Sequence, residues 1–176
     1  MAIVPDTKNW TWVLERECPE CRFDSSTTSA GAVAELTRAN VARWPAVLSR
    51  VDVGVRPDTE TWSALEYGAH VRDVFRLFRI RLALMLAEDD PRFADWNQDS
   101  TAVEERYSEQ DPQLVAEELV EAGLALADDI DAIPADAWQR TGRRGDGSAF
   151  TVDTLMRYYI HDPTHHLHDV GADVGA

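Results

Sequence analysis

The fold is decided by the stretch SALEYGAHVRDVFRLFRIRLALMLA, residues 63–87. Ser63 is followed three residues later by Glu66, a capping box that marks the first turn of a helix. Beyond this box, apolar residues recur at three- and four-residue spacing, which predicts one long helix with a buried face. His70 falls on that face. The stretch therefore predicts a core helix that carries one inward histidine.

Three further segments have the same helical periodicity, and they are residues 29–51, 112–133 and 152–171. The first is expected to bend near Pro45, because proline cannot donate a backbone hydrogen bond. The other two follow Asp111 and Thr151, residue types that commonly cap helices. Four long helices without a convincing pair of strands predict an all-α four-helix bundle.

The connections between these helices indicate the topology. Residues 88–111 form a connection long enough to span the bundle, so the second and third helices can run parallel, in an up-down-down-up bundle. The glycines of residues 142–150 mark a turn or a short extended hairpin. Large apolar side chains before residue 24 predict an N-terminal arm, residues 1–24, packed on a single domain of residues 1–176.

The composition limits the classes of function. Hydrophobic residues make up 44% and charged residues 28% of the chain, as in ordinary globular proteins. The formal net charge of -15 should repel nucleic acid and anionic lipid, so we expect neither as a partner. The sequence has no apolar run of about 18 residues that would predict a transmembrane helix. Its first residues also lack the basic segment followed by an apolar run that is typical of a signal peptide. We expect a cytoplasmic protein.

The histidines predict a metal site. Four of the five lie in HDPTHHLH, residues 161–168, where His161 and His165 share one helix face. His70 can supply a third nitrogen from across the core, although a buried histidine is often only hydrogen-bonded. His166 is rotated about 100° from His165 and should point away. Metal-bound histidines usually donate to a carboxylate, and the nearest by spacing are Glu66, Asp73 and Asp169.

This site would hold a divalent transition metal. Three imidazoles accept zinc, nickel, cobalt, copper or iron, so the ligands alone do not choose the ion. Positions left open on the ion would be available to water or substrate.

The two cysteines, Cys18 and Cys21, stand together as CPEC. Such a pair can bind zinc, cycle as a dithiol or simply pack, but a structural zinc site usually needs a second ligand pair. The remaining candidates are histidines already assigned to the other site. The residues around CPEC also lack the strand-to-helix junction of a thioredoxin-like motif. A fixed turn in the packed arm is therefore our preferred interpretation.

Two segments resemble signatures of the DinB-like superfamily, namely residues 62–74, WSALEYGAHVRDV, and residues 158–170, YYIHDPTHHLHDV. That group includes YfiT-type proteins, mycothiol-dependent maleylpyruvate isomerases and low-molecular-weight-thiol S-transferases. Residues 10–21, WTWVLERECPEC, resemble an N-terminal arm of one branch. The resemblance implies an up-down-down-up bundle, a homodimer, and a zinc- or nickel-type ion on His70, His161 and His165.

In the isomerase branch the first metal ligand of the last helix is a glutamate, whereas His161 stands there in this chain. The resemblance therefore favours the transferase branch, in which a metal-activated thiol such as mycothiol attacks an electrophilic small molecule. Two alternatives stay open: a stress-associated metal-binding protein without catalysis, and a metal-dependent hydrolase. An anionic thiol would need cationic partners, for which the candidates are Arg72, Arg76, Arg79, Arg81 and Arg157.

Overall fold

Three of the four predicted helices begin at the capping residues expected from the sequence. In the computed structural model, which describes residues 9–172, Ser63 and Glu66 form both hydrogen bonds of the capping box that starts α3 (Ala64–Ala87). Asp111 accepts backbone hydrogen bonds at the start of α5 (Pro112–Asp131), and Thr151 does so for α6 (Val152–Asp169). The three predicted helices are thus confirmed, and their ends differ from prediction by about two residues at most.

The first predicted helix is present in pieces. A 3-10 turn (Ala30–Ala32) leads into α1 (Val33–Val41), and α2 (Trp44–Leu48) follows after a break of two residues. Pro45 lies in the first turn of α2, where its missing N–H cannot bond to the carbonyl group of Val41. The bend predicted near this proline is confirmed.

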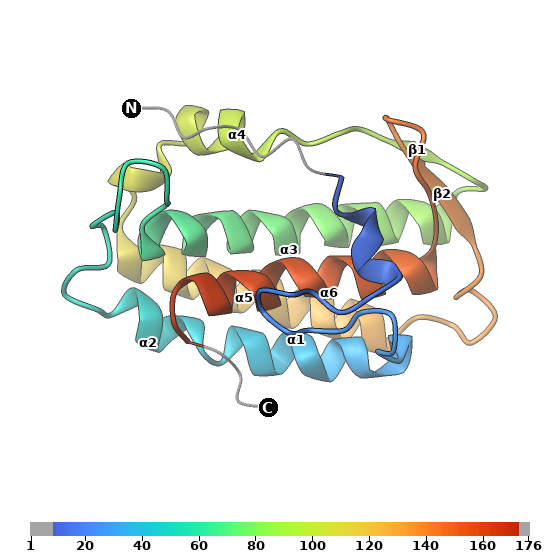
Figure 1. Cartoon of the computed structure of the whole chain (residues 1–176). Helices are drawn as coiled ribbons and strands as arrows, with labels where there is room; N and C mark the ends of the chain where they lie inside the picture. Colours follow the sequence, from blue (N-terminus) through green and yellow to red (C-terminus); the bar gives the residue numbers. More distant parts are fainter. Residues whose placement is uncertain (1–8, 173–176) are drawn as a thin grey trace.

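The four helical segments form the up-down-down-up bundle that the sequence predicts (Figure 1). α1 and α6 run in one direction, and α3 and α5 run in the other. Each helix packs on two neighbours: α3 contacts α5 and α6, and α1 contacts the same two. The long connection after α3 crosses the bundle and includes the short helix α4 (Gln98–Glu104), which lets α5 run parallel to α3.

A small sheet covers one end of the bundle. The predicted hairpin is present as β2 (Thr141–Arg144) paired antiparallel with β3 (Ala149–Thr151). β1 (Arg92–Phe93) adds to β2 in parallel, with Arg92 opposite Arg143. No sequence signal marks β1, because a strand of two residues shows no periodicity.

The core lies between the four helices and reaches to the N-terminal arm. Fully buried side chains from every long helix meet there, including Trp44, Phe75, Leu119, Leu126, Leu155 and Met156. In the arm, the 3-10 helix η1 (Trp10–Leu14) packs against α6, and Val13 and Cys18 are buried. Residues 1–8 of the predicted arm lie outside the described residues. Within residues 9–172, no helix has the length and apolar character needed to cross a bilayer.

Candidate metal centres and their pocket

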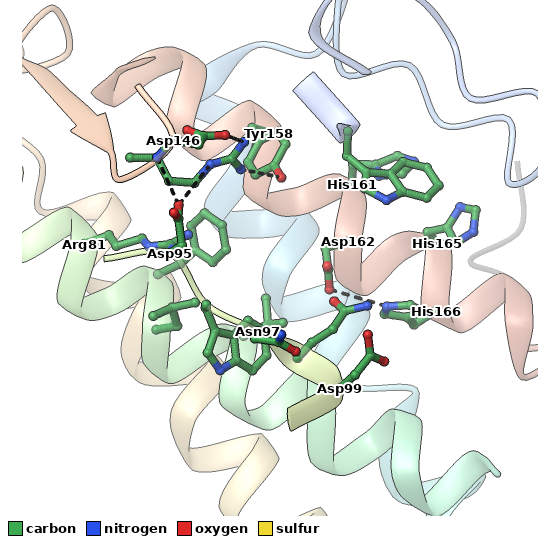
Figure 2. Close-up of a pocket in the computed structure, with 17 residues that line it drawn as sticks. Arg81, Asp95, Asn97, Asp99, Asp146, Tyr158, His161, Asp162, His165 and His166 are labelled. Atoms are coloured by element: carbon green, nitrogen blue, oxygen red, sulfur yellow. Dashed lines mark hydrogen bonds and ion pairs between the residues drawn. The ribbon is translucent and has the colours of Figure 1, made fainter. Parts of the chain in front are cut away.

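The helix α6 presents two pairs of potential ligands rather than one. His161 and His165 are four residues apart, and so are Asp162 and His166. The second pair is offset by one residue, or about 100° of rotation, and therefore faces a different neighbour. Figure 2 shows His166 and Asp162 turned to one side of α6 and His161 to the other. The sequence predicted that His70, His161 and His165 would lie together. The structure instead places His70 in one group and His161 with His165 in another.

His70 lies instead with Asp162 and His166. One ligand atom from each of the three lies within 4.8 Å of the other two. Nε2 of His70 is 3.3 Å from Oδ1 of Asp162, and Nε2 of His166 is 3.7 Å from the same oxygen. Ligand atoms bound to one tetrahedral zinc ion are roughly 3.3 Å apart. The group thus has the spacing of a two-histidine, one-carboxylate metal site.

Buried atoms without partners indicate that this group is incomplete. His70 is fully buried, yet neither of its ring nitrogens has a hydrogen-bond partner, and Oδ1 of Asp162 also lacks one. Leaving such groups unsatisfied costs about 1–3 kcal/mol each, so native proteins rarely do it. A metal ion shared by Nε2 of His70 and Oδ1 of Asp162 would satisfy both atoms. The residues present therefore fit a divalent metal.

The protonation states suit a metal as well. Burial lowers the pKa of His70, so its imidazole is neutral at neutral pH. Burial acts to raise the pKa of Asp162, but the nearby His70 and His166 outweigh it, and the net shift of that pKa is downward. A neutral imidazole and an ionised carboxylate are the forms that bind metals.

Of the three carboxylates expected near the metal ligands, only Asp169 lies there. Its Oδ2 is 2.8 Å from Nδ1 of His166, which leaves Nε2 of that ring facing Asp162. This is the usual orientation of a metal-bound histidine, with its second nitrogen held by a carboxylate. Glu66 instead pairs with Arg56, and the carboxylate of Asp73 accepts hydrogen bonds from Arg72 and Tyr107.

His161 and His165 face the N-terminal arm, where they meet the two cysteines. Sγ of Cys18 is 3.6 Å from Nδ1 of His165, and Sγ of Cys21 is 3.7 Å from Nε2 of His161. One ligand atom from each of the four residues lies within 4.8 Å of the others. The predicted HxxxH pair is therefore paired with CPEC and not with His70.

CPEC forms the fixed turn that we expected, and the structure also places it against two histidines of α6. That interpretation rested on the lack of a second ligand pair, and the structure supplies one from α6. A redox dithiol is disfavoured, because burial raises the pKa of the Cys21 thiol to about 12 whereas reactive cysteines have lowered values. The sequence did contain a signal for this arrangement. Asp162 and His166 are also four residues apart, and assigning them to His70 leaves His161 and His165 free to pair with the two cysteines.

A pocket of about 520 Å³ adjoins both groups (Figure 2). Its volume lies in the usual range for small-molecule sites. Asp162 and His166 line it from α6, together with His161 and His165. Tyr158 of α6 also lines it, and the rest of the wall comes from α3, from the segment between β1 and α4, from the hairpin and from the arm, through side chains that include Trp10, Val74, Phe78, Trp96 and Arg144.

Arg81 stands at the far end of this pocket from His166 (Figure 2). It is 5% exposed, its guanidinium lies over the rings of Phe78 and Phe93, and its Nε has no hydrogen-bond partner. Burial lowers its pKa to about 10, a value that still leaves it charged. Among residues 9–172 no carboxylate pairs with it, whereas the other arginines considered as cationic partners form ion pairs, namely Arg72, Arg76, Arg79 and Arg157.

Two of three comparisons relate the chain to known proteins. A solved structure of YfiT from Bacillus subtilis, reported to have an unusual four-helix bundle topology, matches with a TM-score of 0.66 at 17% identity. The match covers 82% of this chain and 83% of that one, and it shows a shared fold. A search of curated proteins finds no match. The family model of the DinB superfamily matches residues 34–170, and the chain therefore belongs to the DinB superfamily.

Proposed function

We propose that the chain is a metal-dependent transferase, with its catalytic ion held by His70, Asp162 and His166. The observation that carries this proposal is the set of buried, unpartnered atoms on His70 and Asp162 beside a pocket of ligand size. A divalent ion bound there would lower the pKa of a thiol or water and so supply a nucleophile at neutral pH. Zinc is our first choice of ion and nickel the next.

The chain's own residues hold this centre rigidly. The ring of His70 stacks on Trp96 at 5.2 Å and contacts Trp62 at 5.3 Å between ring centroids. Asp169 fixes the ring of His166 through Nδ1. Asp162 and His166 reach the pocket wall, whereas His70 is buried and does not line the pocket, so a substrate in the pocket would approach the ion beside Asp162 and His166.

The nucleophile we propose is a low-molecular-weight thiol such as mycothiol, which attacks an electrophilic small molecule. The family resemblance supports this choice. The contrast between His161 and the glutamate of the isomerase branch counted against isomerisation, but in the proposed site the first ligand from α6 is Asp162, a carboxylate like that glutamate. Thiol-dependent isomerisation therefore returns as a variant of this proposal.

The pocket favours a reactant with a negative group. Arg81 is a buried cation whose Nε lacks a partner, and an anionic oxygen of the thiol or the electrophile would supply one. Tyr158 and Arg144 bond to each other beside it and give that end of the pocket a polar wall. A reactant that spans the pocket would thus place its anionic end on Arg81 and its reacting atom near Asp162 and His166.

Hydrolysis is the second candidate. The YfiT structure is described as that of "a probable metal-dependent hydrolase". Two histidines and one carboxylate are also the zinc ligands of several hydrolases. In that case water replaces the thiol, and the same three side chains act as ligands.

The test is conjugate formation by metal-loaded protein incubated with mycothiol or bacillithiol and a chlorinated aromatic. We expect a thioether product whose rate falls more than about 100-fold in Asp162→Asn, since even outer-shell changes at metal sites cost 10–100-fold. Asp136→Asn, an exposed residue after α5, is the matched control and should keep the wild-type rate. Hydrolysis of an ester or amide panel without any thiol conjugate would show that the transferase proposal is wrong.

A further inference from the structure

We propose that Cys18, Cys21, His161 and His165 bind a second metal ion, a structural zinc that fastens the N-terminal arm to α6. This centre shares no ligand with the group around His70. It uses the two cysteines and the two histidines that the proposed function leaves without a role. Four protein ligands close a tetrahedral site, so no position remains for water or substrate.

The distances between ligands fit zinc. A sulfur at about 2.3 Å and a nitrogen at about 2.0 Å from one tetrahedral ion are roughly 3.6 Å apart. The sulfur-to-nitrogen distances here are 3.6 Å for Cys18 with His165 and 3.7 Å for Cys21 with His161. The spacings C-x2-C and H-x3-H are also those of structural zinc sites. Two thiolates would balance the charge of the ion.

The arm shapes its cysteine pair into a tight turn. The N–H group of Arg22 donates to the carbonyl group of Cys18 at 2.9 Å, and the N–H group of Cys18 donates to the carbonyl group of Phe23 at the same distance. Arg22 adopts a left-handed conformation with φ of 64°, which few non-glycine residues do. This turn closes the loop and directs both sulfurs toward α6.

The histidine side is arranged in the same way. Nε2 of His165 is 3.3 Å from a carboxylate oxygen of Glu20 and 3.7 Å from one of Asp169. The carboxylate of Glu20 therefore lies beside Nε2, while Nδ1 faces the sulfur of Cys18. A carboxylate next to the second nitrogen is the usual surrounding of a zinc-bound histidine. Glu20 lies between the two cysteines in the sequence, so the turn that supplies the sulfurs also orients the imidazole.

The ion would also shape the pocket. Trp10 lies against the rings of His161 and His165, with centroid distances of 5.6 Å and 5.5 Å, and it forms part of the pocket wall. Fixing the arm on α6 therefore fixes that wall.

The experiment measures metal content and ligand type in the intact protein. We expect two zinc ions per chain, and X-ray absorption should show sulfur at about 2.3 Å. The Cys18→Ser/Cys21→Ser variant should retain one ion, and so should the matched variant Asp162→Asn. Replacement by cobalt should give a thiolate-to-cobalt charge-transfer band that is present in Asp162→Asn and absent from the cysteine variant.

Two results would overturn the inference. One is an absorption spectrum of the wild-type metalloprotein with no sulfur neighbour. The other is a disulfide between Cys18 and Cys21 in the protein purified with zinc. Both measurements use the wild-type chain, so they decide the question even if the cysteine variant does not fold. If the wild-type protein binds zinc through sulfur but forms no thiol conjugate, the proposed function is wrong and the structural zinc site still stands.

Discussion

A rotation of one residue along α6 separates the two metal groups. His161 and Asp162 are neighbours in sequence, but the 100° between them directs one to the arm and the other to α3. Asp169 is close to both groups, 2.8 Å from Nδ1 of His166 and 3.7 Å from Nε2 of His165. This carboxylate therefore holds the imidazole of His166 and lies beside that of His165.

The sequence predicted metal ligands among the histidines but did not predict which of them lie together. HxxxH is visible because both members are histidines, whereas Asp162 with His166 has the same spacing and is hidden by ordinary acidic composition. His70 was correctly expected on the buried face of its helix. Which pair on α6 faces it depends on how far that helix is rotated against α3, and periodicity does not define rotation to better than about one residue.

We predict that Arg81→Met weakens binding of an anionic reactant while leaving the stability of the fold nearly unchanged. Removing a buried, unpaired charge should change the free energy of unfolding by about 1 kcal/mol or less in either direction. Loss of a charge-assisted hydrogen bond should weaken binding of an anionic reactant roughly 10- to 100-fold. Urea denaturation and ligand titration measure the two effects. A large loss of stability with unchanged affinity would show that Arg81 serves the fold alone.

The first residues of three helices could be predicted because N-terminal capping depends on residues close together in the sequence. Ser63, Asp111 and Thr151 each bond to backbone groups within three residues, so the sequence around each is sufficient. The strands were harder, since β1 pairs with β2 across about fifty residues of chain and its two residues carry no pattern of their own.

At Gly123, α5 lies very close to two other helices. A Cβ atom there would meet Cγ2 of Val41 on α1 and would lie 2.8 Å from Cε2 of Phe75 on α3. Alanine normally stabilises a helix interior by about 0.5–1 kcal/mol relative to glycine. Here overpacking should outweigh that gain, at a cost of about 1–3 kcal/mol. The close approach of three helices therefore requires glycine.

We predict that Gly123→Ala lowers the free energy of unfolding by about 1–2 kcal/mol, as measured by urea denaturation. Gly54→Ala is the matched control, because a Cβ atom added at Gly54 would meet nothing within 4 Å, and it should shift stability by less than about 0.5 kcal/mol. If Gly123→Ala is as stable as this control, the helices can separate without cost and the packing argument fails.

Across the whole molecule, α6 gathers residues from distant parts of the chain. Cys18 and Cys21 come from the arm and His70 from α3, yet both groups close on one turn of α6 beside one pocket (Figure 2). The up-down-down-up order makes this possible, because α3 and the arm both lie on α6. No local sequence signal defines such an assembly, which depends on how complete helices pack.

The most direct measurement is an anomalous difference map of zinc-loaded crystals collected at the zinc edge. We predict two peaks per chain, one among His70, Asp162 and His166 and the other among Cys18, Cys21, His161 and His165. A single peak shared by His70, His161 and His165 would contradict the division of α6 into two metal-binding faces.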